Sequence, residues 1–309
     1  MEFQHISVLL HETVDALCVK PDGVYVDCTL GGAGHTSLIL SKLNEKGRVI
    51  GIDRDDDALE NARLKVNDPR LITVKNNFEN IDSAVEYAGF DKVDGILMDL
   101  GVSSHQLDVA ERGFSYIKDA PLDMRMDQQS SLTAYDVVNG YSEYDLVRIL
   151  RDYGEEKFAN KIASKICSAR SNSPIKTTLE LADLVSSAIP SKFRYDNGNP
   201  AKRSFQAIRI EVNGELDCIP KAIERGAELL KSGGRMAIIS FHSLEDRLVK
   251  NGFQRLERPC TCPSDFPICV CGKKQVAKII TKKPILPTNE ELEYNSRSHS
   301  AKLRVCEKV

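Results

Sequence analysis

The sequence lacks any run of about 18 consecutive apolar residues, the length that a membrane-spanning helix needs. Its first residues also lack the basic stretch and apolar segment of a secretion signal, so we expect a cytosolic protein. An excess of one charge is absent as well, because 42 Lys and Arg stand against 45 Asp and Glu, for a formal net charge of -3. This balance excludes a uniformly basic, histone-like nucleic-acid binder and an acidic disordered protein.

Cysteine is too scarce for a disulfide framework. The chain has nine cysteines in 309 residues, an odd number without the spacing of small disulfide-rich domains. Four of them form two successive Cys-x-Cys pairs, at Cys260, Cys262, Cys269 and Cys271. Zinc knuckles more often place two residues between paired cysteines. A structural metal site and a loop of reduced thiols therefore both stay open, and we expect no catalytic metal.

What the sequence does contain is an alternation of strand and helix patterns. The first third has four short β-branched runs, each predicted to be a strand of a parallel sheet: 24–28, 48–53, 71–75 and 93–99. Helical patterns at 35–43 and 56–66 predict crossover helices. The later strands are predicted at 235–240, 276–281 and 302–306. The last two are close enough in sequence to pair antiparallel at the edge of the sheet.

A helical segment interrupts this alternation. Residues 110–205 show helical periodicity, at 144–150, 157–169 and 178–189, but no convincing strand. The predicted fold class is therefore α/β, a Rossmann-like sheet of seven strands with an inserted all-helical domain. The predicted domains are 1–109 together with 206–309 for the sheet, and 110–205 for the insertion.

Three aspartates mark the ligand site of the predicted sheet. Asp27, Asp53 and Asp99 end the first, second and fourth strands, so their carboxylates should meet in one crevice. A pyrophosphate there would be repelled by their charges. S-adenosylmethionine carries a sulfonium and an ammonium cation and no phosphate, and it suits the crevice better. The glycine-rich turn at 31–34 also departs from a dinucleotide fingerprint, because Ser37 occupies the place of the third glycine.

The second and third strands predict contacts to a nucleoside. Asp53 lies about twenty residues beyond the glycines, the spacing of an acid that accepts hydrogen bonds from a ribose diol. Asn76, Asn77 and Phe78 follow the third strand and offer amides for the edge of an adenine and a ring for its face. Without the surrounding pattern, Phe78 would be interpreted as a core aromatic residue.

Eight ordered stretches of the chain carry a further signal. They are His5-x-x-Val8-Leu9-Leu10, Asp27-x-Thr29-Leu30-Gly31-Gly32-x-Gly34-His35, Asp53-Arg54-Asp55, Asp99-Leu100-Gly101-Val102-Ser103-Ser104, Glu111-Arg112-Gly113-Phe114-Ser115, Pro121-Leu122-Asp123-Met124-Arg125-Met126-Asp127, Ser240-Phe241-His242-Ser243-Leu244-Glu245-Asp246-Arg247 and Ser300-Ala301-Lys302-Leu303-Arg304. Through them the sequence resembles, over essentially its whole length, the bacterial ribosomal RNA small subunit methyltransferase H family. The loop Ser296-Arg297-Ser298-His299 departs from the family pattern, because it lacks a proline and one arginine.

The resemblance implies a class I S-adenosylmethionine-dependent methyltransferase that modifies N4 of a cytidine in the decoding region of small-subunit (16S) rRNA. It implies cofactor contacts from Ala33, Gly34, His35, Asp53, Phe78, Asp99 and Gln106. It also implies that the helical insertion flanks an RNA cleft. We expect the partner to be rRNA within the assembled 30S subunit, in the cytoplasm. Naked RNA as the substrate and a homodimer as the oligomeric state both stay open.

The chemistry of the acceptor suggests roles for further residues. The N4 lone pair of cytosine is delocalised into the ring, so the enzyme must hold this nitrogen in line with the methyl group. Positioning of this kind lowers a barrier by ~7–11 kcal/mol. We hypothesise that Asp99 accepts a hydrogen bond from the amino group or the cofactor, and that Ser103, Ser104 and the 240–243 loop orient the base. His242 is a candidate proton acceptor, with an ordinary loop histidine and bulk water as the alternatives.

A neutral protein that binds RNA must concentrate its cations locally. Candidate cations in the insertion are Arg112, Lys118, Arg125, Lys192, Arg194, Lys202 and Arg203, and those near the end are Lys273, Lys274, Lys278, Lys282 and Lys283. Each cluster is equally well interpreted as a solvated face.

Two other functions compete, a nicotinamide-dependent oxidoreductase and a non-catalytic RNA-binding assembly factor. The strand-end acids and the missing glycine argue against the first, and the intact Gly34, Asp53 and Asp99 argue against the second.

Overall fold

The computed structural model describes residues 7–194, 198–263, 268 and 270–309, and the chain divides into two compact units. The sheet unit combines Met1–Gly101 with Leu216–Val309, and the helical unit is Val102–Glu215. The helical unit is longer at both ends than the predicted insertion, 110–205. The helical unit continues past residue 205 because the helix α10 (Lys202–Asn213) buries Phe205 and Ile208 in the core of this unit.

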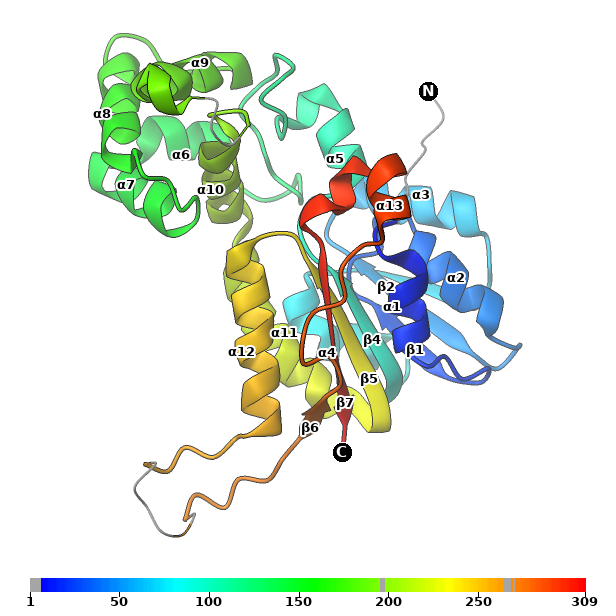
Figure 1. Cartoon of the computed structure of the whole chain (residues 1–309). Coiled ribbons are helices and arrows are strands. Elements are labelled where there is room, and N and C mark those ends of the chain that lie inside the picture. Colours follow the sequence, from blue (N-terminus) through cyan, green and yellow to red (C-terminus); the bar gives the residue numbers. More distant parts are fainter. Residues whose placement is uncertain (1–6, 195–197, 264–267, 269) are drawn as a thin grey trace. The chain divides into compact units, whose positions relative to one another are not determined.

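The sheet unit is built on seven strands in the order β3-β2-β1-β4-β5-β7-β6 (Figure 1). Their bounds are β1 Val24–Asp27, β2 Arg48–Asp53, β3 Leu71–Lys75, β4 Val93–Asp99, β5 Leu230–Ser240, β6 Ala277–Ile279 and β7 Lys302–Lys308. Strands β1 to β5 pair in parallel, and β7 runs antiparallel to both β5 and β6. This arrangement confirms the predicted fold class, including the antiparallel last two strands.

Four strands differ from their predicted bounds: β1 and β6 are shorter than 24–28 and 276–281, β7 extends beyond 306 to Lys308, and β5 differs most. β5 begins at Leu230 rather than at residue 235, because Leu230 already pairs with Val93 ahead of a register shift in the β4–β5 ladder. Gly233 lies in the part of β5 between the two registers and has a φ of 78°. Such a backbone conformation favours glycine, which has no Cβ to clash.

Alternating residues of the central strands form two core layers. On β4, Ile96 and Met98 belong to one layer together with Ile219, whereas Leu97 belongs to the other together with Ile39. The period of two follows from the pleat of a strand, and it explains why β4 is apolar on both faces. Full burial of each such side chain contributes about 1.5–3 kcal/mol.

Helices cover both faces of this sheet (Figure 1). Their bounds are α1 Leu10–Ala16, α2 Gly34–Lys42, α3 Asp56–Val66, η1 Phe78–Asn80, α4 Ile81–Tyr87, α11 Glu215–Leu229, α12 Ser243–Glu257, α13 Asn289–Tyr294 and η4 Ser296–Ser300. The core layer that contains Ile96 is covered by α4, α11 and α12, and the opposite layer by α1 and α2. The predicted crossover helices at 35–43 and 56–66 thus correspond to α2 and α3.

The helical unit has a core of its own. Its elements are α5 Ser104–Asp108, η2 Ala110–Arg112, α6 Ala134–Gly140, α7 Glu143–Asp152, α8 Ala159–Arg170, α9 Thr178–Ala188, η3 Ser191–Phe193 and α10 Lys202–Asn213. Thr133, Ser142 and Thr177 cap three of these helices by accepting hydrogen bonds from backbone amides of the first turn. Among the described residues of the chain, no helix is long and apolar enough to cross a membrane.

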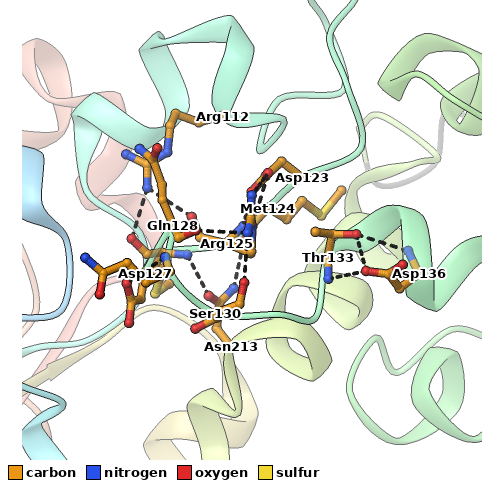
Figure 2. A network of polar contacts seen from close by, with 12 residues as sticks. Arg112, Asp123, Met124, Arg125, Asp127, Gln128, Ser130, Thr133, Asp136 and Asn213 are labelled. Atoms are coloured by element: carbon orange, nitrogen blue, oxygen red, sulfur yellow. Dashed lines mark hydrogen bonds and ion pairs between the residues drawn. The ribbon is translucent and has the colours of Figure 1, made fainter.

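A polar network fixes the segment that precedes α6 (Figure 2). The Arg125 guanidinium pairs with Asp123, with Nη2 2.6 Å from Oδ2. The Arg112 Nη2 donates to the carbonyl oxygens of Arg125 and Met126 at 2.9 and 3.0 Å. Arg112 is only 6% exposed. Both guanidinium groups thus bind internal partners, which argues against Arg112 and Arg125 as RNA-binding cations.

Candidate active site at the carboxyl ends of the strands

The strand order of the sheet reverses between β1 and β4, and in open α/β sheets ligands bind at such a point. Asp27 ends β1 and Asp99 ends β4, while Asp53 ends the neighbouring β2. The loop after β1 joins these ends, because the Thr29 Oγ1 accepts a hydrogen bond from the Asp99 N–H at 2.6 Å and Asp53 Oδ2 accepts one from the Gly31 N–H at 2.9 Å. The fold thus brings the three aspartates to one edge of the sheet.

The glycine-rich turn packs against the segment that precedes α1. A Cβ on Gly34 would lie 2.0 Å from the Ser7 Oγ and 3.1 Å from the Ser7 Cβ, so any other residue here would displace Ser7. The Nε2 of His35 lies 3.1 Å from the Val8 carbonyl oxygen, and the ring is 5% exposed. Ala33, with a φ of 57°, precedes α2 and is buried. Ala33, Gly34 and His35, three of the residues predicted to contact the cofactor, therefore form the turn at this edge of the sheet.

Asp27 is a buried carboxyl group at the centre of the site. It is 1% exposed, and it accepts hydrogen bonds from the Thr36 hydroxyl at 2.7 Å and the Thr29 N–H at 3.2 Å. Burial raises the pKa of Asp27 to about 6, and these hydrogen bonds only partly oppose the shift. The charge of Asp53 makes a smaller contribution to the same upward shift of this pKa.

Asp99 is the most strongly perturbed acid of the three. Burial raises its pKa well above the usual range, and the charges of Asp27, Glu245 and Glu291 add to the shift. Its Oδ1 is buried and has no hydrogen-bond partner within the described part of the chain. A buried carboxylate oxygen without a partner is costly, and a ligand that carries a cation or an N–H donor would remove that cost.

Two of the acids around Asp99 were not identified from the sequence as site residues. Glu245 is 1% exposed, and its Oε2 accepts hydrogen bonds from the Phe241 and His242 N–H groups at 2.7 and 3.3 Å. The Oε1 of Glu291 accepts one from the Leu9 N–H at 2.9 Å. The capping pattern that begins α12 was a usable signal for Glu245. Thr288 and Glu291 have the same spacing at the start of α13, but no local pattern shows the contact of Glu291 with Leu9, 282 positions away in sequence.

His242 is the N-cap of α12. Its Nδ1 accepts a hydrogen bond from the Glu245 N–H at 3.4 Å. Its Nε2 lies 3.1 Å from Glu245 Oε1, within ion-pairing distance but without hydrogen-bond alignment. The neutral ring consequently carries its proton on Nε2, because Nδ1 must be the acceptor of the cap.

Asp53 ends β2, and Phe78 begins η1, three residues after the end of β3 at Lys75. Burial raises the pKa of Asp53, and the N–H groups of Asp55 and Gly31 donate to its two oxygens. Each carboxylate oxygen can accept a second hydrogen bond, so Asp53 can still receive a hydroxyl. Phe78 is 9% exposed and belongs to the core layer that contains Ile96.

Ser103, Ser104 and Gln106 belong to the helical unit. Ser103 and Gln106 form a capping box at the start of α5, in which the Ser103 Oγ accepts from the Gln106 N–H at 3.2 Å and Gln106 Oε1 accepts from the Ser103 N–H at 3.0 Å. Ser104 and Gln106 are both buried. This arrangement gives the start of α5 a fixed conformation directly after the loop that follows Asp99.

An ion pair connects two of the stretches that carry the family resemblance. The Nε of Arg304 on β7 lies 2.6 Å from Oδ1 of Asp246 on α12, and Lys302 adds a contact at 3.4 Å. Burial by itself would raise the pKa of Asp246, but the hydrogen bonds and charges of Arg304 and Lys302 outweigh it and lower the pKa. This pair ties the start of α12, and thereby the His242 loop, to the sheet.

The predicted cysteine cluster lies between α12 and β6. The Sγ atoms of Cys260, Cys262 and Cys271 all lie within 4.8 Å of one another. The fourth predicted member, Cys269, falls outside the described residues. This cysteine cluster is separate in the fold from Asp27, Asp53 and Asp99, which end strands β1, β2 and β4.

Proteins similar to this chain are known by sequence and by structure. A sequence model of the MraW methylase family matches residues 2–309. Proteins named ribosomal RNA small subunit methyltransferase H from Clostridium botulinum strain Kyoto and Clostridioides difficile strain 630 are 61% and 56% identical over 100% of this chain and 100% of their own length. A Streptococcus mutans protein described as a candidate methyltransferase, solved in complex with SAH, is 12% identical over 98% of this chain and 99% of its own, with a TM-score of 0.43.

Proposed function

The chain belongs to the MraW methylase family, which confirms the resemblance found in the sequence, and on that premise we propose that it transfers a methyl group from S-adenosyl-L-methionine to N4 of a cytidine in the decoding region of small-subunit rRNA. Relatives named ribosomal RNA small subunit methyltransferase H support the rRNA substrate. The single observation that carries the chemistry is Asp99, whose buried Oδ1 lacks a hydrogen-bond partner among the described residues at the point where the strand order reverses.

The residues at the strand ends fit a cationic methyl donor. When bound, S-adenosylmethionine supplies an electrophilic methyl group on a sulfonium. The raised pKa values of Asp27, Asp53 and Asp99 reflect burial above all, together with repulsion from neighbouring acids, and a cation among them would offset both. A phosphate in the same place would add to the repulsion. The residues assigned to cofactor binding are Ala33, Gly34, His35, Asp53, Phe78, Asp99 and Gln106.

Asp99 is assigned to orient the acceptor. Its free oxygen is suited to accept a hydrogen bond from the N4 amino group, which leaves the nitrogen lone pair directed away from the carboxylate. Ser103 and Ser104, at the start of α5, are assigned to hold the base, and the capping box keeps that turn rigid. Orientation of this kind reduces the entropy that the reaction must lose at the transition state.

The released proton is assigned to water rather than to His242. Nδ1 of His242 already accepts the Glu245 N–H, so protonation there would break the cap of α12. His242 therefore acts as a positioning residue, which holds the Phe241–His242 backbone beside Glu245.

The helical unit is assigned to the RNA. Lys118, Lys192 and Lys202 of this unit are exposed. Phosphate contacts by such lysines would position the RNA without reading its bases. We place this activity on rRNA of the assembled 30S subunit in the cytoplasm. Since the cytidine must reach the methyl donor, we expect an unpaired or flipped base.

The test measures methyl transfer to small subunits from cells that lack this protein. Wild type, Asp99→Asn and the surface control Asp91→Asn receive labelled S-adenosylmethionine, and the modified nucleoside is identified by mass spectrometry. We expect N4-methylcytidine with the wild type and the control, and a decrease of roughly 10²–10³-fold with Asp99→Asn in a folded protein. Near-normal transfer by Asp99→Asn, or a label on another atom, contradicts the proposal.

Calorimetric titration separates the competing functions. S-adenosylhomocysteine and NAD are titrated separately into the wild-type chain. Binding of S-adenosylhomocysteine alone is the expected result. Binding of NAD alone would indicate the oxidoreductase, and binding of neither would indicate a non-catalytic assembly factor.

A further inference from the structure

Three cysteine sulfurs converge in the loop between α12 and β6. Cys260 and Cys262 lie shortly after the end of α12 at Glu257, and Cys271 precedes β6 at Ala277. Their Sγ atoms all lie within 4.8 Å of one another, and those of Cys260 and Cys271 are 3.8 Å apart. The Val270 N–H donates to the Cys262 Sγ at 3.3 Å. The two ends of the loop are therefore brought together at their thiols.

The sulfur separation distinguishes a metal site from a disulfide. A disulfide places its sulfurs about 2.05 Å apart. Zinc binds thiolates at about 2.3 Å in a tetrahedron, and that geometry separates any two sulfurs by about 3.8 Å. The observed distance between the Sγ atoms of Cys260 and Cys271 is 3.8 Å, as a shared tetrahedral zinc would require. The amide donor on Cys262 agrees with this interpretation, because hydrogen bonds to ligating groups orient them and stabilise their charge.

The cysteine cluster lies in a long loop that a bound metal would stabilise. Residues 258–276 contain no helix or strand among those described. Loops longer than about 12–15 residues without secondary structure are uncommon. Ile268 and Val270 are 75% and 73% exposed, so these apolar side chains do not pack into a core that would order the loop. A metal cross-link between the two ends supplies order that apolar burial does not.

The buried cysteines elsewhere in the sheet unit differ from the three loop cysteines in their surroundings. Cys28, Cys218 and Cys306 are each buried in the core layer with Ile96. Burial raises the pKa of Cys306 to about 12, which keeps it a neutral thiol. Across the described residues, only Cys260, Cys262 and Cys271 form a group with metal-binding geometry. From these observations we infer that Cys260, Cys262 and Cys271 hold a structural zinc ion, with one further donor to complete a tetrahedral site.

The experiment compares metal content in full-length variants purified without chelator and without a metal-affinity tag. The Cys260→Ser/Cys271→Ser double variant removes two ligands, and Cys18→Ser removes an exposed cysteine outside the cluster. We expect about one zinc per chain by plasma mass spectrometry in the wild type and in Cys18→Ser, and loss of the metal in the double variant. Cobalt added to the metal-free wild type should give a thiolate-to-cobalt charge-transfer band that the double variant lacks.

Several outcomes would overturn the inference. These are a wild type without zinc that gives no thiolate-to-cobalt band, equal zinc in the double variant, and a disulfide between Cys260 and Cys271 in non-reduced peptide maps. If the double variant does not fold, the zinc content and the cobalt band of the wild type alone decide whether the site binds metal. Chelation should accelerate proteolysis between α12 and β6, and zinc should reverse it, whereas unchanged cleavage in metal-free protein rejects a structural role. Methyl transfer is not part of this test, so its result is independent of the proposed function.

Discussion

Replacing Asp27 by asparagine should stabilise the ligand-free sheet unit at neutral pH. The Asp27 carboxyl group is 1% exposed, and burial raises its pKa to about 6 although Thr36 and Thr29 donate hydrogen bonds to it. In the unfolded chain an aspartate releases its proton near pH ~3.9. The folded state therefore binds this proton more tightly than the unfolded state does.

The sign and size of the effect follow from proton linkage. Because the folded pKa is raised, the contribution of Asp27 to stability is fully present below about pH 4 and is lost as the pH rises to about 6. The difference of about 2 pKa units corresponds to about 3 kcal/mol. Asparagine keeps an acceptor for the Thr29 N–H but loses the charge-assisted bond to Thr36, so the expected gain above about pH 7 is about 1–2 kcal/mol.

The assay is urea unfolding of the wild type and Asp27→Asn across this pH range. The chain contains no tryptophan, so far-ultraviolet circular dichroism follows the transition. The difference in free energy of unfolding between the two proteins should grow in favour of Asp27→Asn from about pH 4 to about pH 7.

Asp94→Asn is the matched control because its electrostatics are opposite. Burial alone would raise the pKa of Asp94, but Lys231 and Lys20 bind it and lower the pKa, with Nζ atoms at 2.7 and 3.2 Å. Asp94→Asn should therefore destabilise the unit by an amount that is constant above about pH 5. A difference between the wild type and Asp27→Asn that does not change with pH, or an Asp27→Asn protein that is less stable at neutral pH, would refute the reasoning.

Two further predictions concern packing around the site. Arg304→Met removes the 2.6 Å partner of the Asp246 carboxylate and leaves only Lys302 at 3.4 Å, so it should lower the free energy of unfolding by about 2 kcal/mol in the same urea assay. A loss below about 1 kcal/mol contradicts a structural role for the pair. Gly34→Ala places a Cβ 2.0 Å from the Ser7 Oγ and should weaken binding of S-adenosylhomocysteine in calorimetry. A Ser7→Gly background should restore binding, and unchanged affinity of Gly34→Ala alone contradicts a role for this close approach.

Much of the sheet unit could be predicted because its signals are local. β2 and β3 have the predicted bounds, 48–53 and 71–75, and α3 has the predicted bounds 56–66. Strand periodicity and capping residues act within a few positions, so they are readable from the sequence. The prediction of seven strands with an antiparallel edge was also correct. The start of β5 was missed because pairing with Val93 extends that strand across a glycine-containing irregularity.

The sequence by itself determined that Asp27, Asp53 and Asp99 lie at the carboxyl ends of strands, because strand ends follow from a local hydrophobic pattern, and the structure placed these strands side by side. Only the tertiary structure decided what surrounds Asp99, since Glu245 and Glu291 reach it from α12 and α13. It also decided that the Arg112 guanidinium binds backbone carbonyl oxygens 13 and 14 residues away in sequence. Burial, unpartnered atoms and pKa shifts depend on such distant neighbours, and a local sequence pattern carries no record of them.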